Sequence, residues 1–506
     1  MVDRVSNQAR QASALNNVFR LSEDIFANQT ALSTGKKVQR PSDDPAGTRE
    51  TLALRTTLRQ TEQFIRNMSD IRNFVSQSET VLNNVSGVLI RAKELAVNQL
   101  SGTANAQTRK FAVSEVNNLI AEVLQTGNTK IDTRFAFGGS QVTTQPFQES
   151  ASGAIYLGNT EDITIEIGNK MNVVINIPGS DVLATDLNPN LALTTAVTDL
   201  NRGAGISPGS FTISDRAGNT GTVTINNSMT IGDVISAIDS AGTSITASIN
   251  SAQNGLRLTD STPIITQALS VTELGSGSTA SSLGILGQRN GDSIGLDLDP
   301  RVSNSTLISD LNGGEGLTLS SINLVNGGAS GAISFDSATT VGDVLNRINN
   351  AGFNVTAGIS SQGNALRVIS NDSTTTAIVR EVGTGKTGQQ LGLGGGRNVL
   401  TTLIQFKEAL NRDDTSALQA VLENLDTGLE SLGESRAISG SILRRVDDNQ
   451  FVLDQSIVDQ TNQLSNIEDI DFAKKASELA SLELAFQATL NTTARILQPS
   501  ILDFLA

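Results

Sequence analysis

A seven-residue repeat of apolar side chains runs through residues 45–99 and constrains the fold more than any other feature. One column of the repeat comprises Leu54, Thr61, Met68, Val75, Leu82, Leu89 and Ala96, and a second comprises Phe64, Ile71, Ser78, Val85 and Ala92. Sustained heptads mark helices that bury a narrow seam against partner helices. A helix of about 50 residues is roughly 75 Å long, too long for an ordinary globular core. The repeat therefore predicts a rod, and rods are assembly parts more often than catalysts.

The two chain ends repeat this pattern in shorter helices. Residues 1–30 carry Val5, Ala12, Phe19 and Phe26 beside Leu15, Val18, Ile25 and Leu32, and residues 471–497 carry Phe472, Leu479, Phe486 and Thr493 beside Ala476, Glu483, Leu490 and Leu497. A second long apolar seam, from Leu418 to Leu464, precedes the last helix. Each end thus pairs a short helix with a long one. We expect residues 1–44 to lie beside residues 467–506.

Proline and glycine set the expected breaks between these helices. Pro41 and Pro45 disfavour helical geometry in the residue before each, so the first helix must end near residues 32–37, with Gly35 at its C-cap. Pro45 suits the first position of the long helix, and Ser42 or Asp44 can cap it. A third helix, expected over about 106–125, should fold back antiparallel after the turn at Gly102 and Asn105.

The middle of the chain alternates apolar and polar residues and contains an internal repeat. Residues 163–177 predict a β-hairpin turning at Gly168 and Asn169. Residues 230–242 match residues 340–352, and the match continues from Asn254 to Arg257 against Asn364 to Arg367. Each unit is expected to form two strands, a short helix capped by Thr230 or Thr340, and two more strands.

These observations give one expected architecture, an α+β multidomain protein. Paired N- and C-termini form a long antiparallel helical coiled-coil rod, and β-rich domains are inserted in it. The expected domains are a terminal helical assembly domain (1–44 and 467–506), a helical rod with a small β segment (45–185 and 400–466), and two β-rich insert modules (186–295 and 300–398).

The composition removes most enzyme classes. The chain has no Cys, His or Trp and a single Tyr, Tyr156. Without Cys or His, the usual zinc, haem, iron–sulfur and blue-copper sites are lost, as are Cys nucleophiles and Ser–His triads. The carboxylate pairs Asp43/Asp44, Asp447/Asp448 and Glu468/Asp469 are better interpreted as helix caps and dipole partners. We expect no catalytic site, no metal site and no cofactor.

The charge and hydropathy exclude two further classes of partner. The formal net charge is −15, and no run of Lys and Arg offers the clustered contacts that nucleic-acid phosphates need. The same acidity disfavours anionic membrane surfaces. No stretch reaches the roughly 18 apolar residues of a membrane span, and the first 30 residues lack the apolar core of a signal peptide. We expect neither nucleic acid nor membrane as a partner.

Several ordered motifs resemble one family. Residues 32–46 (LSTGKKVQRPSDDPA) are similar to the N-terminal signature shared by bacterial flagellins and hook–filament junction proteins, the third hook-associated proteins. Residues 91–96 and 465–473 resemble further landmarks of that family, and the paired modules resemble its β-rich inserts. The resemblance implies a secreted, extracellular structural subunit of the bacterial flagellum.

The motifs also favour one branch of the family. Residues 128–147, with an aromatic residue, a Gly pair and Pro146-Phe147, resemble the junction proteins, as does the end of the chain, residues 500–505. The expected function is thus to join hook to filament. The alternative is flagellin, the main filament subunit, because the modules make the chain larger than a minimal junction protein. A secreted adhesin is a third alternative, which the near absence of Tyr and Trp disfavours.

The resemblance implies that the terminal helices form the inner tube of an assembly. The expected interface residues between subunits are Leu15, Phe19, Ile25, Phe26, Phe472, Leu479, Phe486, Leu490 and Leu497. Short amphipathic ends are poorly stable alone, so we expect residues 1–40 and 467–506 to be disordered in the free subunit and to fold on assembly. The implied partners are other copies of the chain, flagellin, other hook-associated proteins, and a flagellar export chaperone and export apparatus.

Overall fold

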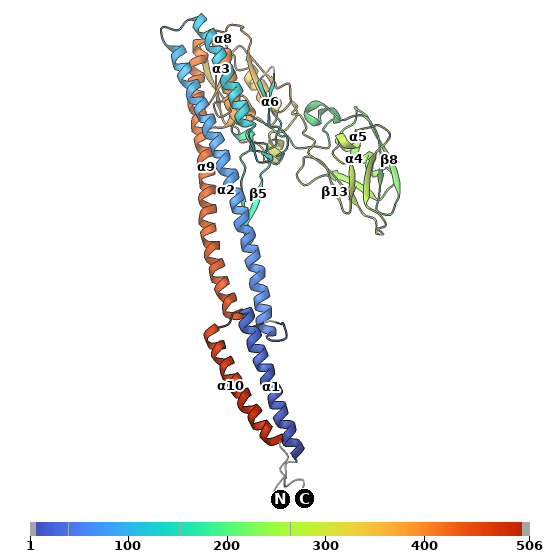
Figure 1. Ribbon diagram of the computed structural model, residues 1–506. Coiled ribbons are helices and arrows are strands. Elements are labelled where there is room, and N and C mark those ends of the chain that lie inside the picture. The colour runs from blue at the N-terminus through green and yellow to red at the C-terminus, as the bar shows by residue number, and fades with distance from the viewer. Residues whose placement is uncertain (1–6, 39, 151–152, 264, 498–506) are drawn as a thin grey trace, which may run out of the picture. The chain divides into compact units, whose positions relative to one another are not determined.

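A computed structural model of the protein describes residues 7–38, 40–150, 153–263 and 265–497 (Figure 1). It mixes long helices near both ends of the sequence with a β-rich middle. The chain divides into two compact units. The terminal unit comprises Met1–Asp70, Glu166–Met171 and Arg445–Ala506, and the central unit comprises Ile71–Ile165 and Asn172–Arg444.

In the terminal unit, helices α1 (Asn7–Thr34) and α10 (Phe472–Leu497) pack against each other. Helix α1 ends where the sequence predicts: Gly35 has φ +71° and donates its N–H to the carbonyl oxygen of Ala31 at 2.8 Å. Helix α2 (Pro45–Leu100) begins at the expected proline. Asp44 Oδ1 accepts from the N–H groups of Ala46 and Gly47 at 3.1 and 2.9 Å, so the carboxylate caps the exposed donors of the first turn.

In the central unit, the heptad columns of α2 are buried as the repeat predicts. Val75, Leu82 and Leu89 are at most 1% exposed, and Ile71, Val85 and Ala92 of the second column are fully buried. Helix α9 (Thr415–Glu468) lies alongside in the opposite direction, because Glu79 pairs with Arg436 at 2.8 Å and Lys93 pairs with Asp426. On the seam of α9, the buried residues are Leu418, Leu425, Leu432 and Val446, and the half-buried ones are Leu429, Leu443, Leu453, Ile457 and Leu464.

Helices α3 (Ala106–Gly127) and α8 (Val399–Asn411) also lie in the central unit and pack together. Asn105 caps α3 through a capping box with Thr108. The predicted inner face of α3 is buried: Ala112, Val116, Leu119, Ile120 and Val123. The third helix is therefore confirmed, two residues longer than expected.

Six short strands follow α3. They are β1 (Lys130–Ile131), β2 (Arg134–Phe135), β3 (Phe147–Ser150), β4 (Gly153–Tyr156), β5 (Thr164–Gly168) and β6 (Met171–Val174). They form three two-stranded sheets, β1–β2, β3–β4 and β5–β6. The β5–β6 pair is the hairpin that the alternation of residues 163–177 predicts.

The first β-rich module folds around helix α4 (Ile231–Asp239). Its strands are β7 (Gly209–Ser214), β8 (Thr220–Ile225), β9 (Ile245–Ile249), β10 (Leu256–Asp260), β11 (Leu269–Glu273), β12 (Gly287–Arg289) and β13 (Ser293–Ile294), with a short helix α5 (Thr279–Ser282). They form two sheets, in the order β12-β11-β7-β8 and β13-β10-β9. Thr230 caps α4 through a capping box with Asp233, which confirms the predicted cap.

The second module repeats this plan around helix α6 (Val341–Asn349), which Thr340 caps in the same way. Its strands are β14 (Ile322–Asn326), β15 (Ala329–Ile333), β16 (Val355–Ile359), β17 (Leu366–Ser370), β18 (Ile378–Glu381) and β19 (Gly394–Gly395), with a short helix α7 (Thr387–Leu391). The sheets are β15-β14-β18-β19 and β16-β17. The expected order of two strands, helix and two strands is confirmed in both modules, and each adds further strands.

The segments on either side of the first module contribute to both cores. Leu187, which precedes the first module, is 1% exposed in the core of the second module. Leu298, which follows the first module, is 1% exposed in the core of the first. The first module is therefore inserted into the second, between Leu187 and Val302.

Candidate assembly site

The short segment that follows α1 (residues 35–37) and the one that precedes α10 (residues 468–470) lie against each other in the terminal unit. The N–H of Lys37 donates to the carbonyl oxygen of Glu468 at 2.5 Å, and the N–H of Ile470 donates to that of Gly35 at 3.1 Å. These two bonds make an antiparallel bridge between Lys36 and Asp469. The break after α1 is thus joined by main-chain bonds to the break before α10, although more than 400 residues separate them in sequence.

A small ion cluster surrounds this bridge. Lys36 Nζ lies 2.9 Å from Glu468 Oε2 and 2.7 Å from Asp469 Oδ1. The guanidinium of Arg55, on α2, lies 2.8 Å from the carboxylate of Glu468. Glu468 is 4% exposed, so its charge is compensated by two cations in a largely buried position. The cluster therefore connects the end of α1, helix α2, the end of α9 and the start of α10.

The cluster shifts the pKa values of its members. Burial alone would raise the pKa of Glu468, but the hydrogen bonds from Lys36 and Arg55 outweigh it and lower that pKa. The hydrogen bonds from Lys36 and Ser465 lower the pKa of Asp469. The bonds to Asp469 and Glu468 raise the pKa of Lys36. All three groups are therefore held in their charged forms by one another.

Strand β5 of the β5–β6 hairpin makes a second connection within the terminal unit. Asn67 Nδ2, on α2, donates to the carbonyl oxygen of Glu166 at 2.7 Å, and Asn449 Nδ2, on α9, donates to that of Ile167 at 2.7 Å. The side chain of Ile167 is fully buried. Two amides on two helices thus hold one hairpin, and α2 and α9 are bridged by it.

Along α1 and α10, the terminal pair leaves large apolar side chains uncovered. Leu15, Phe19 and Phe26 of α1 are 42%, 65% and 70% exposed. At about 100° per residue they fall within roughly 40° of one another around the helix, so they form one stripe. Removing such apolar surface from water is favourable, so contact with another chain that covers it would be stabilised. We call these three residues the α1 stripe.

The predicted interface residues thus divide into two groups. The exposed group comprises Leu15, Phe19, Phe26, Phe472 and Leu490, and the half-buried group comprises Ile25, Leu479 and Phe486. Leu497 is the last residue of α10, and its side chain lies outside the described residues. That all nine residues contact other subunits stays a prediction.

Sequence reasoning did not identify the cluster of Lys36, Arg55 and Glu468. It treated residues 32–46 and 465–473 as separate motifs, and it interpreted Glu468 and Asp469 as caps. The signal was present, because both motifs interrupt a short and a long helix at matching distances from the chain ends. One further exposed apolar residue, Leu484 on α10, was also missed; it is 73% exposed, on a different side of the helix from Phe472 and Leu490.

The described residues contain no group of three or more His, Cys, Asp or Glu side chains that could hold a metal ion. Asp43 and Asp44, an acidic pair named from the sequence, act locally: Asp43 Oδ2 accepts from the N–H of Arg40, and Asp44 caps α2. No helix within the described ranges combines the length and apolarity that crossing a bilayer requires.

Comparisons with known proteins agree with this geometry. Residues 5–141 match the bacterial flagellin N-terminal helical region, and residues 422–505 match the bacterial flagellin C-terminal helical region. Flagellar hook-associated protein 3 of Escherichia coli is 28% identical over 152 residues, which cover 30% of this chain and 47% of that protein. The same protein of Salmonella typhimurium is 23% identical over 180 residues, 35% of this chain and 56% of that protein.

Other relatives and structures were also found. The flagellar filament 41 kDa core protein of Borreliella burgdorferi is 35% identical over 100 residues, 20% of this chain and 30% of that protein. A crystal structure of flagellar hook-associated protein 3 from Legionella pneumophila superposes with a TM-score of 0.39 at 14% identity, covering 82% of this chain and 98% of that one. The chain spans about half the length of the two hook-associated relatives that it matches.

Proposed function

Because this chain belongs to the bacterial flagellin family, through both terminal helical regions, we propose that it is the structural subunit that joins the flagellar hook to the filament. The observation that carries the proposal is the terminal pair, in which α1 and α10 are joined at their breaks and still expose apolar side chains. Hook-associated protein 3 relatives in two organisms support the junction role.

In this proposal the terminal helices form an antiparallel coiled coil that assembles with copies of itself. Each Leu or Phe of the α1 stripe would contribute on the order of 1.5–3 kcal/mol if a neighbouring subunit buried it fully. In the free subunit that contribution is missing, so we infer that the two helices are only marginally stable before assembly and become fully ordered as they pack; the expected disorder of residues 1–40 and 467–506 lies partly outside the described residues. A heterologous contact repeated around an axis then gives a ring or a tube.

The proposed partners follow from this role. They are other copies of the chain, flagellin and other hook-associated proteins, and the flagellar export chaperone and export apparatus that would deliver the chain. The proposed location is the extracellular flagellum. The work is architectural and involves no catalysis.

A deletion strain tests the proposal. Loss of a junction subunit leaves hooks that carry no filament and releases flagellin into the medium, which electron microscopy and immunoblotting detect. Deletion of residues 1–44 and 467–506 should likewise abolish incorporation. Normal filaments in the deletion strain would overturn the junction role, and incorporation of the truncated chain would overturn assembly through the terminal helices.

The second candidate function is flagellin, the main filament subunit. The match to the Borreliella burgdorferi filament core protein supports it, at higher identity over a shorter segment. The same deletion strain separates the two functions, because a strain that lacks flagellin still carries a short junction stub on each hook. An adhesin would instead retain its binding after the ends are removed.

A further inference from the structure

The two modules differ at one sheet edge, although the sequence of that edge is repeated. Arg257 on β10 and Arg367 on β17 occupy the same position in the matched segments 254–257 and 364–367. In the first module, β10 lies between β9 and β13. In the second module, β17 pairs with β16 alone among the described strands. One edge of β17 therefore lacks the neighbour that its counterpart has.

The first module shows how the third strand is held. The N–H of Gly295 donates to the carbonyl oxygen of Leu256 at 2.6 Å, and Ile294 lies opposite Arg257 in the register of β10 and β13. The side chain of Arg257 lies 2.6 Å from Asp292 Oδ2, at the start of that strand. Main-chain bonds and one ion pair thus hold an extended segment in which acidic Asp292 is followed by Ser293 and then by apolar Ile294 and Leu296.

The second module has the equivalent of β10, which is β17, but among the described strands it has no equivalent of β13. After β19 the chain turns into α8 and does not return along β17. A groove of about 220 Å³ remains there, and its lining includes Leu366, Arg367, Val368 and Ile369 of β17, Ile404 and Glu408 of α8, and Ile155 of β4. Arg367 is exposed, and no carboxylate among the described residues pairs with it.

We propose that the free edge of β17 is a docking site for an extended strand of a partner chain, with an acidic residue facing Arg367 and apolar residues alternating along the groove. Strand addition to an exposed sheet edge draws its affinity from main-chain hydrogen bonds and its specificity from pockets for alternate side chains. Arg367 supplies the charge complementarity, and the half-buried Val368 and exposed Ile369 supply the apolar contacts. This surface is separate from the terminal helices.

The test uses the intact chain and a peptide with the sequence of residues 289–297, acetylated and amidated so that its termini carry no charge. This peptide contains Asp292 and the donor Gly295, and it reproduces the strand that β10 binds. We expect saturable binding in a fluorescence anisotropy titration. R367E should weaken binding by roughly tenfold, because it removes an attraction and adds a repulsion. A D292K peptide should restore binding to R367E.

Two controls make the result specific. A peptide with sarcosine at position 295 loses the donor that bonds β10, so it should bind more weakly to the edge of β17 as well. R257E carries the same charge reversal in the first module and should leave binding unchanged. Absence of saturable binding up to about 1 mM peptide would overturn the proposal. So would binding that responds to R257E and not to R367E, because the peptide would then be exchanging with β13.

Discussion

Leu187 and Leu298 hold the same position in two different modules. The N–H of Leu187 donates to the carbonyl oxygen of Asn364, and the N–H of Leu298 donates to that of Asn254, both at 2.8 Å. Asn254 and Asn364 are equivalent in the internal repeat. Each module is thus closed by a leucine from a linker, and the second module receives its leucine from the linker that precedes the first. This arrangement shows that the first module is inserted within the second.

Leu298→Ala should destabilise the first module alone. Removing a buried leucine side chain costs about 2–5 kcal/mol, depending on how far the cavity collapses. The first module is continuous in sequence between its linkers, so it can open while the second stays closed. Hydrogen exchange should show faster amide exchange in β9 and β10 and unchanged exchange in β16 and β17. Equal acceleration in both modules would contradict the nesting.

Leu187→Ala should have the reverse effect, although Leu187 is far from the second module in sequence. We expect a similar cost, about 2–5 kcal/mol. The amides of β16 and β17 should exchange faster, and those of β9 and β10 should keep their protection. Faster exchange confined to the first module, the one next to Leu187 in sequence, would contradict the placement of Leu187 in the core of the second module.

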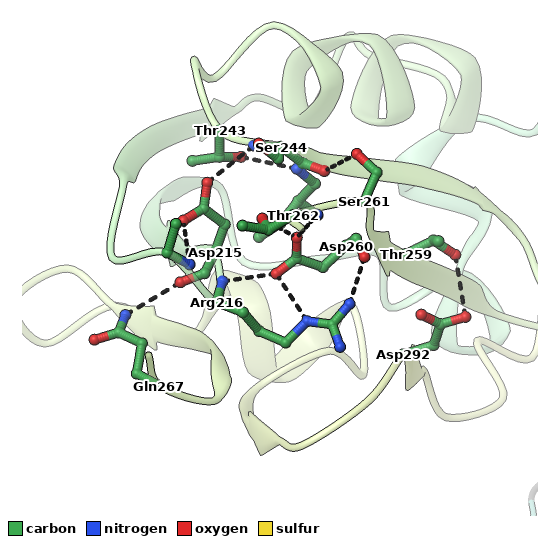
Figure 2. Close-up of polar contacts among 12 residues, drawn as sticks. Asp215, Arg216, Thr243, Ser244, Thr259, Asp260, Ser261, Thr262, Gln267 and Asp292 are labelled. Carbon is green, nitrogen blue, oxygen red and sulfur yellow. Dashed lines mark hydrogen bonds and ion pairs between the residues drawn. The ribbon is translucent and has the colours of Figure 1, made fainter. Parts of the chain in front are cut away.

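We expect Asp260 to stabilise the first module, because its carboxylate holds Arg216 in the turn between β7 and β8. Its Oδ2 accepts from the N–H of Arg216 at 2.7 Å and from Arg216 Nε at 3.3 Å, and its side chain is fully buried (Figure 2). Asp260→Ala removes the carboxylate that Arg216 contacts and leaves the half-buried guanidinium only the main-chain carbonyl oxygen of residue 260, so it should cost about 3 kcal/mol. The control is Asp372→Ala, an exposed aspartate that accepts from the N–H of Thr374, and its cost should be much smaller. Urea titration measures both, and similar costs would contradict the prediction.

The same network predicts a response to acid in the first module. Burial would raise the pKa of Asp260, but its hydrogen bonds, including those from Thr262 and Arg216, outweigh burial and lower that pKa. The pKa of Asp215 is lowered in the same way by Asn219, Ser244 and Ala217. Because both folded-state pKa values lie below the unfolded value of about 3.9, their stabilisation is present above pH 4 and is lost as the pH falls through the folded values. Urea titrations from pH 6 to about pH 2 should show this loss in the native chain, and the loss should be smaller in Asp260→Asn.

Substitution in the α1 stripe should prevent assembly without unfolding the subunit. Phe19→Ser and Phe26→Ser remove exposed side chains, so little intramolecular packing is lost, whereas burial between subunits worth on the order of 1.5–3 kcal/mol each disappears. The matched control is Phe111→Ser on α3, whose side chain is 69% exposed in the central unit. Sedimentation and incorporation into hooks should fail for the stripe variants and persist for the control. Equal loss in all three would indicate a general effect of removing exposed phenylalanine.

Local features of the sequence determined much of this protein. The heptads set α2, because a seam buried every seven residues specifies a helix with a partner. Gly35 and Pro45 set the helix ends, since a left-handed residue stops one helix and a fixed φ starts the next. Thr230 and Thr340 mark the helices of the two modules, because each hydroxyl caps the first turn. These signals act within a few residues, and they can be read without knowing the rest of the fold.

The pattern of helices paired the two chain ends, but only the tertiary structure decided which residues of distant segments meet. Nothing near Lys36 indicates that Glu468 compensates its charge, and nothing near Leu187 indicates that it closes the second module and not the first. Both contacts join residues separated by long stretches of chain, so they depend on how whole elements pack and not on local preference. The open edge of β17 has the same origin: its sequence repeats that of β10, and the path of the chain into α8 alone leaves it unpaired.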